Sequence, residues 1–225
     1  MMDRKILLGV VALAAVSLSI ALMLPEDTTV NNGDTLPWNI VHPTPYTTRV
    51  LGVTLGESTL EQAELKFEEA AVVSMFQSAD SKLAVEAFFE EVNLNGLKAK
   101  IVLTMEIPSF ELPGIFDRGL RINNTTSGKR ITLSTEDLAR VRKSPIGSLT
   151  YLPAVRLDEA VLIKRFGEPA QRVRETKSGA IHWLYPQHGL DITLGGEEKP
   201  LLQFLSPTNF ELLRSPLLAQ GEILK

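Results

Sequence analysis

The chain has 225 residues, no cysteine and a formal net charge of −4, and 44% of its residues are hydrophobic. These values exclude a polytopic membrane protein, a disordered chain and a small disulfide-stabilised domain. The mildly acidic balance also argues against direct binding to nucleic acid. The apolar residues are concentrated near the N-terminus, which indicates a polar body that follows one hydrophobic segment.

The hydrophobic segment is Ile6–Leu24, with 16 apolar side chains in 19 positions. As a helix, it would rise about 28 Å, close to the ~30 Å hydrocarbon core of a bilayer. Arg4 and Lys5 precede it and predict a cytoplasmic N-terminus. We expect residues 1–24 to be a signal-anchor helix that crosses the inner membrane once, with the body in the periplasm. A long, cleaved signal peptide is the alternative.

Residues 25–48 contain four prolines and no apolar periodicity, which is typical of a linker. Trp38, Ile40 and Val41 are its apolar cluster. We expect this cluster to pack on the body, and a binding epitope for a partner is the alternative.

Residues 49–106 predict a first α+β repeat, in which a helix precedes an antiparallel meander. Ser58 and Glu61 have the spacing of a capping box, and apolar residues follow at helical spacing over about 58–69. Strand-like stretches come next, at Val72–Phe76, Leu83–Phe89 and Leu97–Met105.

Residues 107–148 form a connecting segment with one expected helix. It is predicted to contain an apolar loop at Ser109–Phe116, a polar turn at Arg121–Lys129 and a short strand at Arg130–Leu133. Ser134 then has the position of an N-cap and predicts the helix.

The apolar loop is a candidate partner site, because large apolar side chains around a Pro-Gly pair are hard to bury. The side chains concerned are Phe110, Leu112, Ile115 and Phe116. Packing of this loop under the body is the alternative.

Residues 149–225 repeat the order of the first repeat. A helix is predicted over Leu157–Phe166, and Gly167 and Pro169 supply its end. Strands are predicted at Gln171–Arg174, Ala180–Tyr185, Leu190–Leu194 and Leu201–Leu205. The tail from Phe210 has paired leucines around Pro216 and is interpreted as a segment that docks on a partner.

The predicted fold class is therefore α+β, with an N-terminal transmembrane helix followed by two similar helix-plus-antiparallel-meander halves. The helix ends at Phe67 and Phe166 mark corresponding points 99 residues apart, which indicates an internal duplication.

Short motifs in both halves resemble the repeat of the SmpA/OmlA (BamE-like) envelope proteins. One is Leu51–Thr59, which leads into a helix ending at Phe67, and the others are Phe166–Pro169, His182–Tyr185 and Gly189–Ile192. In that family a helix ends in a glycine–proline stop, and a strand with a Trp-x-Tyr pattern opens a meander. The resemblance implies a small α+β envelope module that binds protein partners, here in two copies. The chain departs from the family's lipoproteins because it has no lipobox cysteine.

Candidate chemistry is confined to the histidines. His182 lies in a predicted strand and His188 in the turn after it, and a hairpin could bring both near Asp191 as metal ligands. We favour the alternative, in which they are an exposed strand histidine and a turn histidine. His42 is expected to be solvated in the linker.

No other pattern supports catalysis. The sequence contains no cysteine nucleophile and no Gly-x-Ser-x-Gly elbow. The pair Glu90-Glu91 would point to opposite faces of a strand and so would not form an acid/base dyad. We expect no enzymatic activity and no cofactor.

The expected function is that of a membrane-tethered periplasmic module of the bacterial envelope, non-enzymatic, that binds or assembles proteins. Its expected partners are an envelope or inner-membrane protein and, through residues 6–24, the lipid bilayer. The alternative is a metal-dependent enzyme or a small-ligand-binding protein that uses the His182/His188 hairpin or a groove between the halves.

Overall fold

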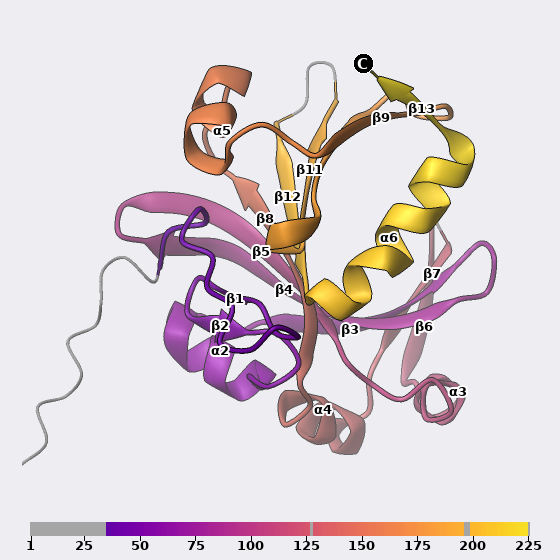
Figure 1. Cartoon of the computed structure of the whole chain (residues 1–225). Helices are drawn as coiled ribbons and strands as arrows, with labels where there is room; N and C mark the ends of the chain where they lie inside the picture. The colour runs from indigo at the N-terminus through magenta and orange to yellow at the C-terminus, as the bar shows by residue number, and fades with distance from the viewer. Residues whose placement is uncertain (1–34, 127, 196–198, 225) are drawn as a thin grey trace, which may run out of the picture. The chain divides into compact units, whose positions relative to one another are not determined.

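The computed structural model describes residues 35–126, 128–195 and 199–224. Over these residues the protein is a mixed α+β fold with five α-helices and one antiparallel sheet of eleven strands (Figure 1). The expected α+β class is therefore confirmed. The predicted membrane span Ile6–Leu24 lies outside the described residues. Within the part that is described, no helix is both long enough and apolar enough to cross a membrane.

The strands of the large sheet lie in the order β13-β9-β10-β11-β12-β8-β5-β4-β3-β7-β6, and β1 and β2 form a small separate ribbon. The elements are β1 Arg49–Val50, β2 Val53–Thr54, α2 Leu60–Phe67, β3 Val72–Ser78, β4 Leu83–Leu94, β5 Leu97–Met105, α3 Leu112–Asp117, β6 Arg121–Thr125, β7 Gly128–Thr132, α4 Thr135–Arg142, β8 Ile146–Pro153, α5 Glu159–Phe166, β9 Gln171–Glu175, β10 Ile181–Tyr185, the 3-10 turn η2 Pro186–His188, β11 Leu190–Leu194, β12 Leu201–Leu205, α6 Pro207–Gln220 and β13 Gly221–Leu224.

Strands β8 and β12 join two groups of strands into one sheet. The first strand group is β3, β4, β5 and β8, and the second strand group is β9, β10, β11 and β12. Antiparallel pairing of β8 with β12 places Thr150 opposite Gln203 at the junction. The two meanders are therefore parts of a continuous sheet.

The main hydrophobic core lies on one face of this sheet, which we call the core face. Side chains alternate along β5, so that Ile101 and Leu103 are buried while Lys100 is exposed. Apolar residues of α2, α4 and α5 pack into the core on this side. Figure 1 shows α2 and α5 on one side of the central strands and α6 on the other.

Helices α2 and α5 occupy corresponding places in the chain. Their first residues, and also their last residues, lie 99 positions apart. At both N-caps, Thr59 and Asp158, the side chain accepts a hydrogen bond from the backbone N–H three residues later. Both helices end before a residue with positive φ, Glu68 at 54° and Gly167 at 78°. The strands that follow, β3 and β9, also begin 99 positions apart.

Each of these helices places an aromatic ring against its strand group. The rings of Phe67 and Phe89 meet edge to face with centroids 5.2 Å apart, and those of Phe166 and Tyr185 lie 6.1 Å apart. The Tyr185 hydroxyl also donates to the carbonyl of Gly167 at 3.0 Å. Burial raises the pKa of Tyr185 to about 12. The same helix-to-strand contact is thus made twice.

The described part of the predicted linker packs on the body. Trp38 and Ile40 contact the main core, which confirms the expected docking of these two residues, whereas Val41 is half-exposed. The Thr48 hydroxyl is buried and donates to the carbonyl of Leu205 at 2.9 Å.

The capping box of α2 lies one residue later than predicted. Thr59 and Gln62 make its reciprocal hydrogen bonds. The Ser58 hydroxyl instead accepts a hydrogen bond from the N–H of Thr54 at 3.0 Å, so Ser58 and Glu61 do not form the box.

The connecting segment also differs from its prediction. Residues Arg121–Lys129, predicted as a polar turn, contain β6 and the start of β7, which pair as a hairpin. Ile122 is the single apolar residue of β6, so the strand has no apolar alternation by which it could be recognised. The predicted apolar loop contains the short helix α3.

The C-terminal tail forms α6, which docks on the protein's own sheet. Phe210 is buried, and Leu213, Leu217 and Leu218 pack beside it. The expectation that this tail docks on a partner is therefore wrong. Pro216 lies inside this helix, where a proline removes a backbone hydrogen bond.

The adjacent glutamates of β4 do not point to opposite faces as expected. The pairing of β4 with β5 shifts between Phe89 and Val92, which is the mark of a β-bulge. Glu90 and Glu91 are both exposed, and they form ion pairs with Lys100 and Lys98 on the same face of β5.

Candidate functional site

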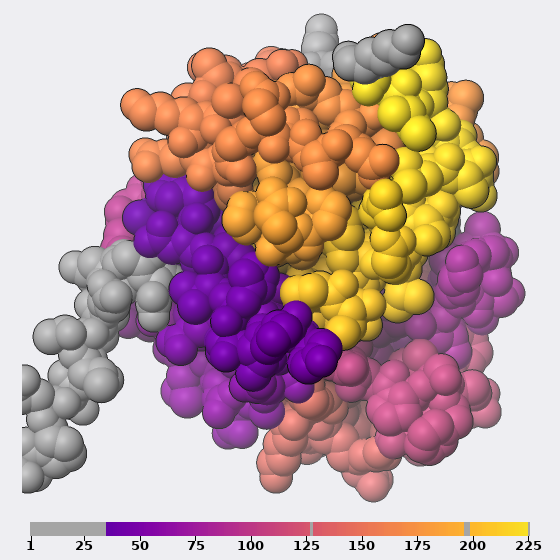
Figure 2. All heavy atoms as spheres, viewed as in Figure 1, coloured from indigo at the N-terminus to yellow at the C-terminus, as the bar shows by residue number. Residues whose placement is uncertain are grey.

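The face of the sheet opposite the main core is only partly covered. Helix α6 packs on the second strand group, where Val173, Leu184 and Leu205 form a small apolar cluster with Phe210. Figure 2 shows α6 (yellow) flanked by the orange surface of the second strand group and the magenta surface of the β3–β4 hairpin. Among the described residues, no helix packs on this face of the first strand group.

The uncovered part forms a shallow hollow of about 250 Å³, which we call the open face. Val72 is 54% exposed, and Phe76, Phe88 and Val102 are partly exposed. None of these apolar side chains belongs to either buried cluster. The complete lining of the open face is Val72, Ser74, Phe76, Glu86, Phe88, Val102 and Arg130.

Two charged side chains lie within this hollow. Arg130 Nε donates to the hydroxyl of Ser74 at 2.9 Å. Glu86 lies on the strand opposite Ser74, and burial raises the pKa of its carboxyl. Within the described part of the chain, neither charge has an ion-pair partner. A second hollow of about 350 Å³ shares Phe76 and Glu86 with the open face and extends it toward β7. The open face therefore combines apolar contact area with unpaired charges.

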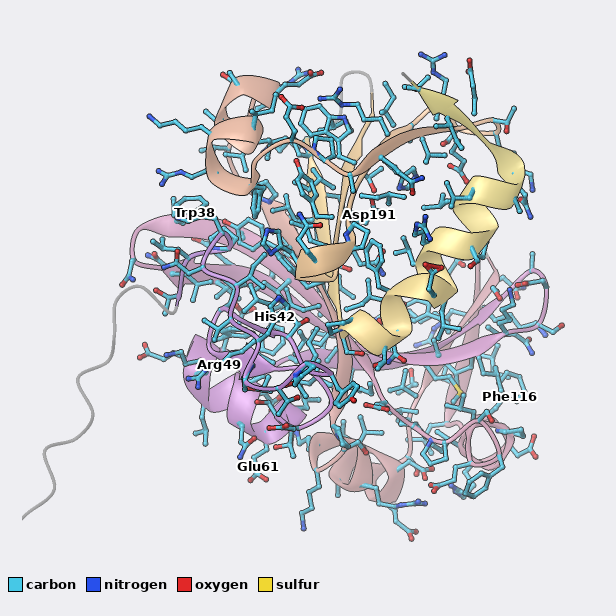
Figure 3. The ribbon with its side chains drawn as sticks, viewed as in Figure 1. Trp38, His42, Arg49, Glu61, Phe116 and Asp191 are labelled. Atoms are coloured by element: carbon cyan, nitrogen blue, oxygen red, sulfur yellow. The ribbon has the colours of Figure 1, made fainter. Side chains whose placement is uncertain are left out.

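The covered part of the same face holds a buried polar pair. His182 Nδ1 donates to Asp191 Oδ2 at 2.7 Å, and the side chains are 13% and 2% exposed. The Thr193 hydroxyl lies 3.3 Å from His182 Nδ1. Burial alone would lower the pKa of His182, but the hydrogen bond and the charge of Asp191 raise it. Figure 3 shows Asp191 between the strands and α6.

The structure brings together two of the three predicted metal ligands. His188 lies in η2, with its ring 6.3 Å from that of Tyr185 and 6.5 Å from that of His42. Its pKa is lowered by burial and by His42. Within the described residues, no group of three His, Cys, Asp or Glu side chains is placed to hold a metal ion. The expectations that His182 is an exposed strand residue and that His42 is solvated are also wrong.

The predicted partner loop is mostly packed. Phe110 is 81% exposed, but Ile115 is buried, and Leu112 and Phe116 pack against the main core. Figure 3 shows Phe116 on α3, away from α6. The four residues therefore do not form one exposed apolar patch. Sequence reasoning missed the open face because its side chains alternate with core residues along β3, β4 and β5.

A larger cavity of about 840 Å³ lies at the end of the sheet where the two strand groups meet. Lys100 and Leu152 line it from the first group, and Thr193 and Leu201 line it from the second. Thr193 connects the cavity to the His182–Asp191 pair. This cavity corresponds to the groove expected between the halves.

No family model, curated protein or solved structure matches this chain. The resemblance to the SmpA/OmlA (BamE-like) family stays a prediction from short sequence motifs.

Proposed function

We propose that this protein is a membrane-tethered, non-enzymatic module of the bacterial envelope that binds or assembles other proteins. Residues 6–24 would cross the inner membrane once with the N-terminus in the cytoplasm, and the α+β body would lie in the periplasm. The length of the apolar segment and the basic residues before it support this placement. The observation that carries the binding role is the open face.

The body is proposed to contain two copies of one helix-and-meander module, as in the SmpA/OmlA resemblance. The equal spacing of α2 and α5, their matching caps and their matching aromatic contacts support a duplication. β8 overlaps the expected start of the second repeat at residue 149. On this proposal it is instead the last strand of the first copy, and it pairs with β12, the last strand of the second copy.

The open face has the composition of a protein-binding surface. Protein interfaces combine an apolar, often aromatic centre with a polar or charged rim. Here Phe76 and Phe88 supply the centre, and Arg130 and Lys129 supply part of the rim. These apolar side chains belong to neither buried cluster, although the Lys100 ammonium lies 5.8 Å from the centroid of the Phe88 ring. Covering them would release water from apolar surface and favour association.

Site-specific photo-cross-linking in living cells tests this function. The full chain would carry benzoylphenylalanine at Val72 on the open face or, as a control, at Glu61, which is exposed on α2 on the other side of the sheet (Figure 3). We expect an adduct with another envelope protein from position 72 and none from position 61. If positions 72, 76 and 88 all fail to give an adduct, the proposed binding role is wrong.

The large cavity favours a second candidate function, the binding of a small ligand. Its volume is in the range of ligand pockets. Its lining combines the apolar Leu152 and Leu201 with the ion pairs Lys98–Glu91 and Lys100–Glu90. Native mass spectrometry of the purified full chain would detect a co-purifying molecule. A Leu201→Trp variant, which fills the cavity, should lose that molecule, whereas an unliganded wild type would contradict this function.

A further inference from the structure

The pairing register shows which open-face residue corresponds to the residue beneath α6. The junction pair is Thr150 on β8 and Gln203 on β12. In the first strand group, Val102 on β5 lies opposite Thr150, and Phe88 on β4 lies opposite Val102. In the second strand group, Asp191 on β11 lies opposite Gln203, and Leu184 on β10 lies opposite Asp191. Phe88 thus lies at the position, counted from the junction, that Leu184 occupies beneath α6.

Helix α6 shows what this position accepts. Phe210, Leu213 and Leu217 follow one another at three- and four-residue intervals, so they share one side of the helix. This side packs on Leu184 and Val173. In the second strand group this face is therefore covered by a helix that places bulky apolar side chains over β9 and β10.

We infer that the open face binds an amphipathic helix of a partner protein, in the place that corresponds to α6. This inference rests on the proposed binding function and adds the class of partner. The helix would present a bulky apolar residue at every third or fourth position to Phe88, Phe76 and Val102.

The charges at the open face specify the flanks of this helix. Glu86 lies on β4, and the two cations, Arg130 and Lys129, lie on β7. Arg130 donates to the neutral Ser74, and Lys129 lines the adjoining hollow. Among the described residues, neither cation has a carboxylate partner. An acidic side chain beside the apolar stripe would reach Arg130 and form a charge-assisted hydrogen bond there. The partner helix is thus apolar on one side with an acidic residue at its edge.

A fluorescent synthetic peptide of residues 206–220, the α6 sequence, is the probe for this site. Its fluorescence anisotropy would be measured with the full chain in detergent. We expect saturable binding to the wild type and at least tenfold weaker binding to Phe88→Ser, because the apolar contact is lost. Leu65→Ser is the matched control, since Leu65 is 76% exposed on α2, and it should bind as the wild type does.

Three outcomes would overturn the inference. They are no peptide binding, equal binding to the wild type and Phe88→Ser, and an open-face cross-link that joins residues 1–34 of the same chain. If the peptide bound by displacing α6 from the second strand group, Phe88→Ser would not weaken its binding. That result is the second of these outcomes. Open-face cross-links that map to every second residue of a partner would indicate a bound strand, in which case the proposed function stands and the helix is wrong.

Discussion

At the residue scale, one buried carboxylate joins two helices. Asp137 is 1% exposed, and it accepts hydrogen bonds from Arg118 Nε at 3.0 Å, Arg118 Nη2 at 2.6 Å and the Ser134 hydroxyl at 2.7 Å. Arg118 follows the last residue of α3, and Ser134 is the N-cap of α4. The Arg118 guanidinium lowers the pKa of the carboxyl.

We predict that Asp137→Asn lowers the free energy of unfolding by about 2 kcal/mol, because a buried charged acceptor is lost. The folded pKa lies below the ordinary value of 3.8. The contribution of the carboxylate is therefore present above that value and lost as the pH falls through the folded pKa. Urea unfolding at neutral and acid pH measures this. Asp117→Asn, an exposed neighbour, should change little, and equal effects of the two variants would contradict the prediction.

His182 predicts a pH dependence of the opposite sign. Its folded pKa is raised above the ordinary value of 6.5, so the contribution of the ion pair with Asp191 is fully present below that value. It is lost as the pH rises through the folded pKa. We expect the stability advantage of the wild type over His182→Gln to shrink as the pH rises above the ordinary histidine pKa of 6.5. Thermal unfolding measures the difference, and an advantage that is constant with pH would count against the ion pair.

At the element scale, α5 ends in a backbone conformation that is essentially restricted to glycine, whereas α2 ends before Glu68 in the left-handed helical region. Gly167 has φ 78° and ψ −172° after the last residue of α5, a region of backbone space essentially restricted to glycine. We predict that Gly167→Ala lowers the free energy of unfolding by about 1–3 kcal/mol, although open space surrounds the position. Gly195→Ala, at an equally open glycine without positive φ, is the control for chemical denaturation.

Phe210 is predicted to hold α6 on the sheet. It is 2% exposed. Phe210→Ala should lower the free energy of unfolding by about 3–5 kcal/mol, because apolar contacts are lost and a cavity is left behind. The variant should increase the rate of amide hydrogen exchange more in α6 than in α2. An equal increase in both helices would show that the loss is global and not confined to α6.

Local sequence signals were sufficient for some elements and insufficient for others. Helices α2 and α5 and strands β3, β4 and β5 were predictable because caps, stops and apolar periods coincide there. β6 was not, because its backbone pairing with β7 stabilises a strand that lacks an apolar alternation. α6 was not predicted either. It contains Pro216, an unfavourable residue inside a helix, and packing of its leucines on the sheet offsets that cost.

The candidate site was less predictable than the fold. The open face depends on which strands are neighbours and on where α6 ends, and both are set by contacts between residues far apart in the sequence. The contact between His182 and Asp191 could be predicted from the hairpin alone, because β10 and β11 pair directly. The pairing of His188 with His42 could not, since it joins the N-terminal segment to a distant turn.

At the scale of the whole body, the shared sheet and core predict a single unfolding transition. β8 pairs with β5 on one side and with β12 on the other, so neither strand group has an independent edge at the junction. We expect amides of β4 and β10 to lose hydrogen-exchange protection at the same urea concentration. Loss of protection in two separated steps would show that the strand groups fold independently.

The two edge strands of the large sheet, β6 and β13, have a consequence for self-association. β6 has five residues, all exposed and mostly polar, and β13 has four. Both edge strands are short and so offer little unpaired backbone to a neighbouring molecule, and β6 is also polar. This disfavours the strand-by-strand growth that leads to fibres. The body can thus keep an apolar sheet face available for binding without polymerising through its edge strands.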